Sequence, residues 1–115
     1  MTKNIFVTRV MQRDIKRLKK KYPKVLLDLR KLNDHLSQGQ ILGDAIAGVS
    51  EGFEHKVYKV RLASSDQNRG KRGGFRVIYY VVTEEDIYLL SMYAKAQRDN
   101  IRIDDIQFLL DQLSQ

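Results

Sequence analysis

Three β-rich runs follow one another between residues 57 and 94, and they limit the possible folds more than any other feature. The runs predict strands over residues 57–63, 75–82 and 87–94. An eleven-residue polar, glycine-rich stretch and a four-residue turn-like stretch connect them, and neither connection has a helical pattern. Strands joined by such helix-free connections pair antiparallel. The sequence therefore predicts a mainly antiparallel sheet.

In the sequence, predicted helices lie both before and after this strand-rich region. Apolar residues recur at helical spacing in two stretches that Pro23 separates, and once more near the C-terminus. These residues are Met11, Ile15, Leu18 and Tyr22, then Val25, Leu29, Leu32 and Leu36, and finally Ile106, Leu109, Leu110 and Leu113. A short strand over residues 5–7 precedes Thr8, which suits an N-cap, and Gly39 suits the end of the second helix. The predicted order is β-α-α-β-β-β-α, an α+β fold with an N-terminal helical hairpin and a C-terminal helix.

The composition limits the class of protein. A chain of 115 residues, 43% of them hydrophobic, has enough apolar surface for one core, so we expect a single domain over residues 1–115. The absence of cysteine excludes disulfides and thiolate chemistry, and two histidines argue against a multi-histidine metal site. No apolar run approaches the roughly 18 residues of a membrane span, and the N-terminus lacks a signal-peptide pattern. We therefore expect a soluble cytoplasmic protein with no metal, no small-molecule cofactor and no membrane partner.

The formal net charge of +7 is unevenly distributed along the chain. Residues 1–31 contain eleven Lys/Arg and two acidic residues, and residues 56–76 contain seven Lys/Arg and one acidic residue. The acidic residues lie mainly in the intervening and C-terminal segments, in stretches typical of surface turns. Two cationic blocks favour a basic face for a polyanion, usually a nucleic acid, although a solvated helix surface also explains the first block.

The second cationic block contains the candidate site residues. If the first two predicted strands pair, Lys59, Arg61 and Arg76 lie on one face of the sheet, and such clustered cations must face water or an anion. The connecting loop adds Lys71 and Arg72 as charges, and Gly73 and Gly74 as residues whose backbone N–H groups can approach a phosphate. Alternatively, the three strand cations lie at a polar edge of the sheet or bind an acidic protein partner. The alternative for the loop is an unstructured hairpin tip.

Aromatic and histidine residues provide further candidates. The strand tyrosines Tyr79, Tyr80, Tyr88 and Tyr93 offer surfaces for unstacked bases, and we expect two of the four to be core residues. Lys95 and Arg98 follow the third strand and can close a site at its C-terminal end. We expect His35 to be a surface residue, and His55 is a candidate base.

Several motifs in these strands resemble the RelE/HigB family of bacterial toxin–antitoxin systems, and the HigB-like branch most. They are residues 58–62 (Tyr-Lys-Val-Arg-Leu), residues 70–80 with Gly-Lys-Arg-Gly-Gly-Phe-Arg at their start, residues 87–90 (Ile-Tyr-Leu-Leu), and residues 93–95 (Tyr-Ala-Lys). The resemblance is specific over residues 57–101. It implies a RelE/ParE-like fold and a ribosome-dependent endoribonuclease that cuts mRNA in the decoding site, with a cognate antitoxin as protein partner.

The resemblance also implies roles for the candidate residues. Lys59 matches the strand lysine proposed as general base, and its cationic neighbours favour the neutral amine that a base requires. Arg61 and Arg76 would hold the phosphate, and Lys95 completes the predicted catalytic set. Lys71, Arg72, Gly73, Gly74, Tyr93 and Arg98 form the predicted RNA-binding set. Where the family carries an arginine acid, this chain has Ala96, so Lys95 or Arg98 would supply the proton.

Two other functions remain open at this point. One is a ParE-like toxin of the same fold that inhibits DNA gyrase, which the strand cations argue against. The other is a non-catalytic RNA-binding module, which would bind RNA in a strongly salt-dependent way without cutting it.

Overall fold

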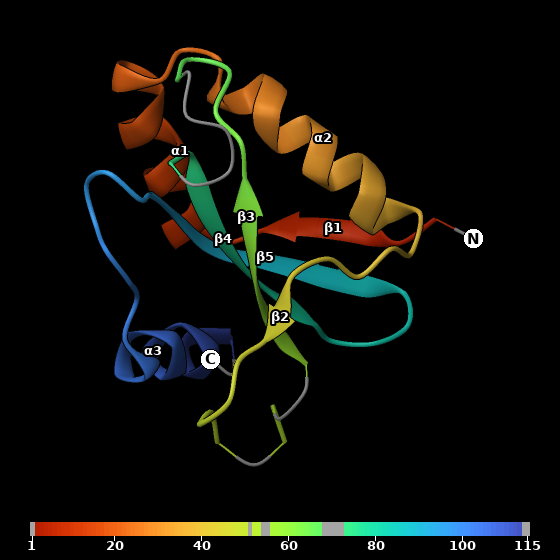
Figure 1. The fold of residues 1–115 in the computed structure, drawn as a ribbon. Coiled ribbons are helices and arrows are strands. Elements are labelled where there is room, and N and C mark those ends of the chain that lie inside the picture. Colours follow the sequence, from red (N-terminus) through yellow and green to blue (C-terminus); the bar gives the residue numbers. More distant parts are fainter. Residues whose placement is uncertain (1, 51, 54–55, 68–72, 114–115) are drawn as a thin grey trace.

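The computed structural model describes residues 2–50, 52–53, 56–67 and 73–113. Its elements are β1 (Asn4–Val7), α1 (Arg9–Lys21), α2 (Val25–Ser37), β2 (Asp44–Ala45), β3 (Val57–Leu62), β4 (Phe75–Val81), β5 (Asp86–Ala94) and α3 (Ile103–Leu113) (Figure 1). The strands form one sheet in the order β1-β5-β4-β3-β2. Strand β1 pairs parallel with β5, and the other neighbours pair antiparallel. The α+β architecture and the antiparallel β3-β4-β5 meander are confirmed.

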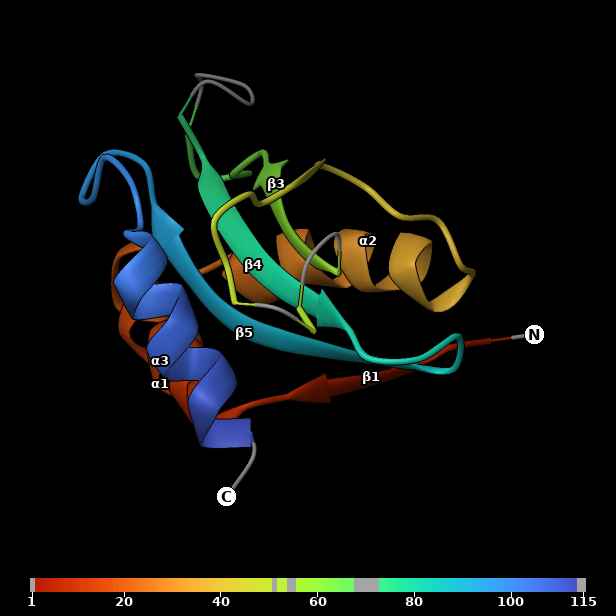
Figure 2. The same ribbon diagram turned by 90° about the horizontal axis from the view of Figure 1, so that it is seen from below.

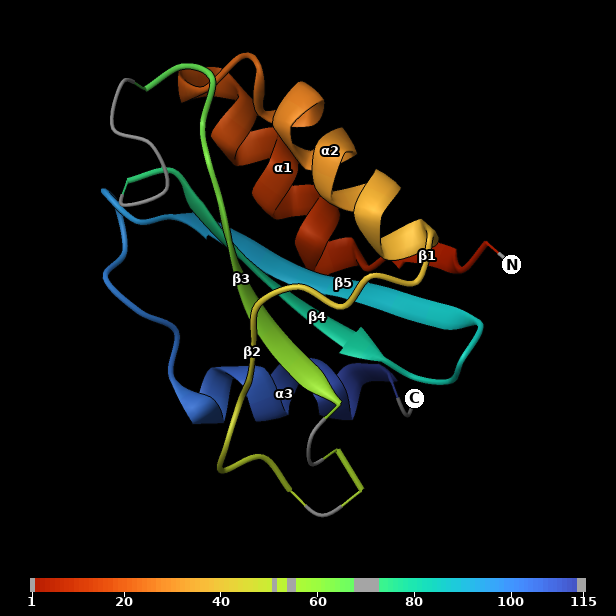
Figure 3. The same ribbon diagram turned by 45° about the vertical axis from the view of Figure 1, so that its right-hand side comes forward.

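The helices lie on opposite faces of the sheet (Figures 2 and 3). The α1-α2 hairpin packs on one face, which presents alternate residues of each strand such as Val60, Val77 and Met92. Helix α3 packs on the other face, against Ile78 and Leu90. The predicted helical stripes explain this arrangement, because each presents its apolar side to the sheet.

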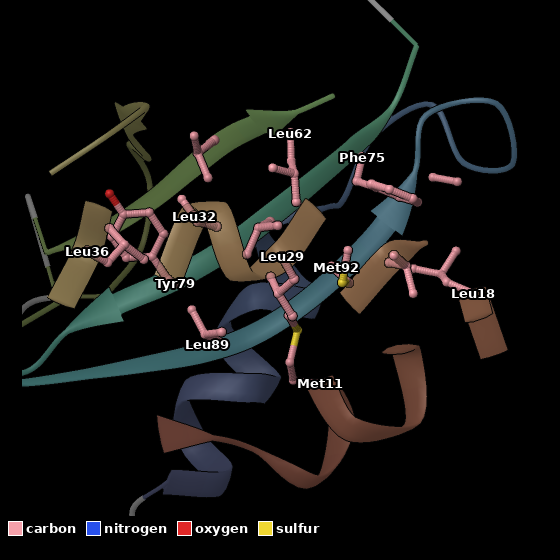
Figure 4. Close-up of a cluster of buried hydrophobic side chains, with 14 of the residues drawn as sticks. Met11, Leu18, Leu29, Leu32, Leu36, Leu62, Phe75, Tyr79, Leu89 and Met92 are labelled. Carbon is pink, nitrogen blue, oxygen red and sulfur yellow. The ribbon is translucent and has the colours of Figure 1, made fainter. Parts of the chain in front are cut away.

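The larger core lies between the hairpin and the sheet (Figure 4). Met11, Leu18, Leu29 and Leu36 of the predicted stripes are all buried there. The expected N-cap is present, since the Thr8 side chain accepts a hydrogen bond from the Met11 backbone N–H (3.2 Å). These contacts fix the hairpin on one face and leave the opposite face for α3 and the site.

A register shift in the β4-β5 pair changes which face the end of β5 presents. Ile78 pairs with Ser91, whereas the next residue, Tyr79, pairs with Leu89, so Leu90 is an extra residue on β5. Because side chains alternate along a strand, this extra residue reverses the alternation beyond it. Tyr93 therefore faces the α3 side, whereas uninterrupted alternation would place it on the hairpin side.

The structure corrects two expectations. The predicted element order has no strand between the second helix and β3, but the structure has a short one, β2, in which Asp44 is the register partner of Lys59. The acidic residues are also not confined to surface turns. Asp14 accepts hydrogen bonds from the Ser91 hydroxyl and the Met92 N–H, and Asp28 accepts two from Ser65, so both carboxylates are buried where these donors offset the cost of desolvation.

None of the helices in the described part of the chain is both long enough and apolar enough to span a membrane.

Candidate functional site

A polar cleft of about 410 Å³ opens on the α3-facing side of the sheet. It is lined by Asp44, Lys59, Arg61, Arg76, Tyr93, Lys95, Asp99 and Asn100. These residues come from β2, β3, β4, β5 and the segment that follows β5. The cleft thus contains all four predicted catalytic residues and Tyr93, one of the four tyrosines predicted as stacking surfaces.

Strand alternation places the cations of β3 and β4 together. Lys59 and Arg61 are two residues apart on β3 and share a face, while Tyr58, Val60 and Leu62 point into the hairpin core. Arg61 lies directly opposite Arg76 in the β3-β4 register. The expectation that these three side chains lie on one face is confirmed by the cleft that they line.

Arg76 is the most deeply set of the cations, with only 6% of its surface exposed. Its Nη1 donates to the backbone carbonyls of Gly73 (2.9 Å) and Phe75 (3.2 Å). Burial and the adjacent Arg61 charge lower the pKa of Arg76, and nearby Tyr93 opposes this effect. A guanidinium held in place beside a second cation is a favourable partner for a phosphate, which both arginines can contact.

Tyr93 enters the cleft because of the bulge in β5. It lies opposite Arg76 in the β4-β5 register. Burial raises the pKa of Tyr93, so its hydroxyl is protonated at neutral pH. Tyr79, in contrast, lies in the hairpin core, where its hydroxyl donates to the Leu42 carbonyl and accepts from the Leu42 N–H, and burial raises its pKa to about 12. Tyr79 and Tyr93 are the two buried tyrosines of the four candidates, as expected.

The segment after β5 supplies the remaining wall of the cleft. The Lys95 ammonium donates to the Asp99 carboxylate (2.9 Å) and to the Asp99 backbone carbonyl. The hydrogen bond and the charge of Lys95 lower the pKa of Asp99. The Lys59 ammonium donates to Oδ1 of Asn100 (3.2 Å), so both lysines of the cleft contact this segment.

Arg98 does not line the cleft. Its Nε donates to the Asn100 carbonyl (3.0 Å), its Nη2 pairs with Asp105 of α3 (2.8 Å), and its guanidinium lies 5.7 Å from the centre of the Tyr93 ring. These contacts connect the segment after β5 to α3. In the free protein, Arg98 therefore braces the cleft wall.

The predicted loop residues are only partly within the described structure. Lys71, Arg72 and His55 lie outside the described residues. The Gly73 carbonyl accepts from Arg76, and the Gly74 N–H donates to the Gln67 side chain (2.9 Å). The Gly74 amide is thus already hydrogen-bonded in the free protein. His35 is an exposed residue in the last turn of α2, as expected.

Three residues of the cleft were not predicted from the sequence, namely Asp44, Asp99 and Asn100. Asp44 belongs to a two-residue strand, which is too short for a periodic signal. Asp99 and Asn100 belong to an irregular segment, where sequence patterns do not indicate which side chains meet. Among the described residues, no group of three or more His, Cys, Asp or Glu side chains is arranged to hold a metal ion.

Comparisons with known proteins give a consistent result. A family model described as the RelE toxin of the RelE/RelB toxin–antitoxin system matches residues 3–113. Among solved structures, a mutant of the E. coli toxin RelE in the free state is similar to this chain, with a TM-score of 0.51 and 21% sequence identity. That match covers 86% of this chain and 90% of the E. coli chain. The structural likeness shows a shared fold.

Proposed function

The chain belongs to the RelE toxin family of toxin–antitoxin systems, and on this premise we propose that it is an endoribonuclease that cuts mRNA in the ribosomal decoding site. Family membership implies a cognate antitoxin as partner. The proposed substrate places the active toxin in the cytoplasm. The HigB-like branch remains a prediction from the motifs.

One observation carries the proposal: Lys59, Arg61, Arg76, Tyr93 and Lys95 line a single cleft. Four of these side chains bring cationic groups from two central strands and the segment after β5 to one place. A phosphodiester gains negative charge during internal cleavage, and preorganised cations stabilise that charge most strongly. The cleft therefore supports phosphodiester cleavage better than it supports RNA binding alone.

In the proposed reaction, the ribose 2′-hydroxyl attacks the adjacent phosphorus. The neutral Lys59 amine takes the hydroxyl proton as the new O–P bond forms. The bond from phosphorus to the 5′-oxygen breaks, and the Lys95 ammonium gives that oxygen a proton. The products are a 2′,3′-cyclic phosphate and a 5′-hydroxyl, and no water or metal is consumed.

The other residues of the proposal hold the RNA. Arg61 and Arg76 contact the non-bridging phosphate oxygens and offset their charge. Tyr93 offers the edge of its ring to the nucleotide beside the scissile phosphate. Lys71, Arg72 and Gly73 contact the RNA backbone from the loop between β3 and β4, and Gly74 does so once its N–H leaves the Gln67 side chain. Arg98 supports RNA binding indirectly, because it holds the segment after β5 against α3.

The proposal is tested by inducing the protein in bacteria and mapping mRNA ends on ribosome-bound transcripts. We expect growth arrest with new ends inside translated codons for the wild type. Lys59→Ala and Arg76→Ala should each reduce cleavage by about 100-fold or more, because each removes one interaction with the transition state. The double variant should restore growth.

Arg13→Ala is the matched control, because it removes an equal charge from an exposed position on α1. It should leave growth arrest unchanged. A folded double variant that is as toxic as the wild type would contradict the assigned site. Intact mRNA together with damaged DNA would point to gyrase inhibition instead.

A further inference from the structure

Asn100 lines the cleft, and its side-chain oxygen accepts two hydrogen bonds. Its side-chain oxygen accepts hydrogen bonds from the Lys59 amine (3.2 Å) and from the backbone N–H of Ile101 (2.9 Å). The first bond crosses from β3 to the segment after β5, forty-one residues along the chain. The second bond fixes the orientation of the Asn100 side chain relative to its own backbone.

The backbone around Asn100 is also anchored. Arg98 donates to the Asn100 carbonyl and pairs with Asp105 on α3, while the adjacent Ile101 is buried in the core beneath α3. Both oxygens of Asn100 are thus engaged by anchored groups. An acceptor fixed in this way can hold a flexible lysine side chain at lower entropic cost than a mobile one.

We propose that Asn100 is a positioning residue that holds the Lys59 amine for proton transfer, an inference that rests on the proposed function. A neutral amine has two N–H donors and one lone pair. When one N–H is held by Asn100, the lone pair is confined to fewer directions, among them the open cleft. An amide oxygen accepts from the ammonium and, more weakly, from the neutral amine, so it can orient Lys59 in both protonation states.

The charges around Lys59 explain why an uncharged acceptor matters there. Asp44 faces Lys59 from β2, Arg61 from β3, Arg76 from β4, and the Lys95–Asp99 pair from the segment after β5. Asn100 adds a fixed contact without changing this charge balance. A carboxylate at the same position would favour the ammonium form, which is inactive as a base.

The inference is tested with Asn100→Ala in steady-state cleavage of mRNA on an excess of programmed ribosomes. For Asn100→Ala we expect kcat to fall about tenfold with KM within about twofold of wild type, since orientation is lost but the phosphate contacts remain. Gln97→Ala is the control, because Gln97 is exposed in the same segment and does not line the cleft. It should leave both constants unchanged. A kcat for Asn100→Ala equal to that of wild type would overturn the inference.

A second measurement does not depend on RNA cleavage. The titration of Lys59 is followed by NMR of its side-chain carbon and nitrogen in the free protein. Asn100→Asp should move the midpoint to a pH higher by about one unit, because an opposite charge within hydrogen-bond distance favours the ammonium. Asn100→Ala should move it far less, because it removes an uncharged acceptor and introduces no charge. An unmoved midpoint in Asn100→Asp shows that Asn100 does not hold Lys59, and overturns the inference.

The two measurements separate this inference from the proposed function. If the wild type cuts no mRNA while the Asn100→Asp midpoint moves, the proposed function fails and the contact between Asn100 and Lys59 stands. If the wild type cuts mRNA while the midpoint does not move, the function stands and the role of Asn100 fails.

Discussion

At the scale of single residues, the cleft contains two arginines that lie opposite each other on neighbouring strands, so two like charges are in close proximity there. Arg61 and Arg76 are register partners, and like charges directly opposite on a sheet are destabilising. Burial lowers the pKa of Arg76, and the Arg61 charge lowers it further. The free protein therefore tolerates an unfavourable contact that a bound phosphate would relieve.

Arg61→Gln should increase the stability of the protein and reduce its cleavage activity. Removing one of the facing charges should raise the free energy of unfolding by about 0.5 kcal/mol, the usual size of such a pair effect. Cleavage should fall about 100-fold, since one stabilising contact to the transition state is lost. Urea denaturation and single-turnover kinetics measure the two effects. Arg13→Gln is the control for charge removal alone, and a loss of stability in Arg61→Gln would contradict this account.

At the scale of elements, regular periodicity was predictable and its interruptions were not. The stripe from Met11 to Leu18 predicts α1, and the alternation of Val60 and Leu62 with Arg61 predicts β3, because each pattern follows from packing against one face. The bulge at Leu90 could not be predicted, since it depends on how β4 and β5 pair. It determines that Tyr93 enters the cleft.

Strand β2 depends on close backbone approach at a glycine. Gly43 has a positive φ of 88°, and a Cβ there would lie 2.3 Å from the Lys59 carbonyl oxygen. Only a residue without a side chain allows β2 to lie against β3 beside Lys59. The close approach of Gly43 to the Lys59 backbone is a tertiary contact, so the glycines between α2 and β3 do not indicate it in the sequence.

Gly43→Ala should reduce both stability and cleavage. We expect about 2 kcal/mol or more of destabilisation, because strained backbone and a clash between backbone atoms act together. Gly52→Ala is the matched control: Gly52 also has a positive φ, of 95°, but its Cβ would meet nothing within 4 Å among the described atoms. Thermal unfolding measures the difference between the two variants, and equal losses would show that the approach of Gly43 to β3 is unimportant.

At the scale of the whole molecule, the two cationic blocks lie on different sides of the sheet. The first belongs to the hairpin, whose apolar stripe packs on one face and whose exposed side carries Lys16, Lys19 and Lys20. The second supplies Lys59, Arg61 and Arg76 to the cleft on the other face. Only the second block therefore supplies cations to the cleft, and the exposed lysines of the first block match the alternative of a solvated helix surface.

The most direct test of the account compares two messages on programmed ribosomes, one all-ribose and one with a single 2′-deoxynucleotide before the scissile phosphate. Internal attack requires the 2′-hydroxyl, so the wild-type protein should cut only the first message. The products should end in a 2′,3′-cyclic phosphate and a 5′-hydroxyl. Cleavage of the deoxy message at a similar rate, or products with a 5′-phosphate, would contradict the proposed chemistry of the cleft.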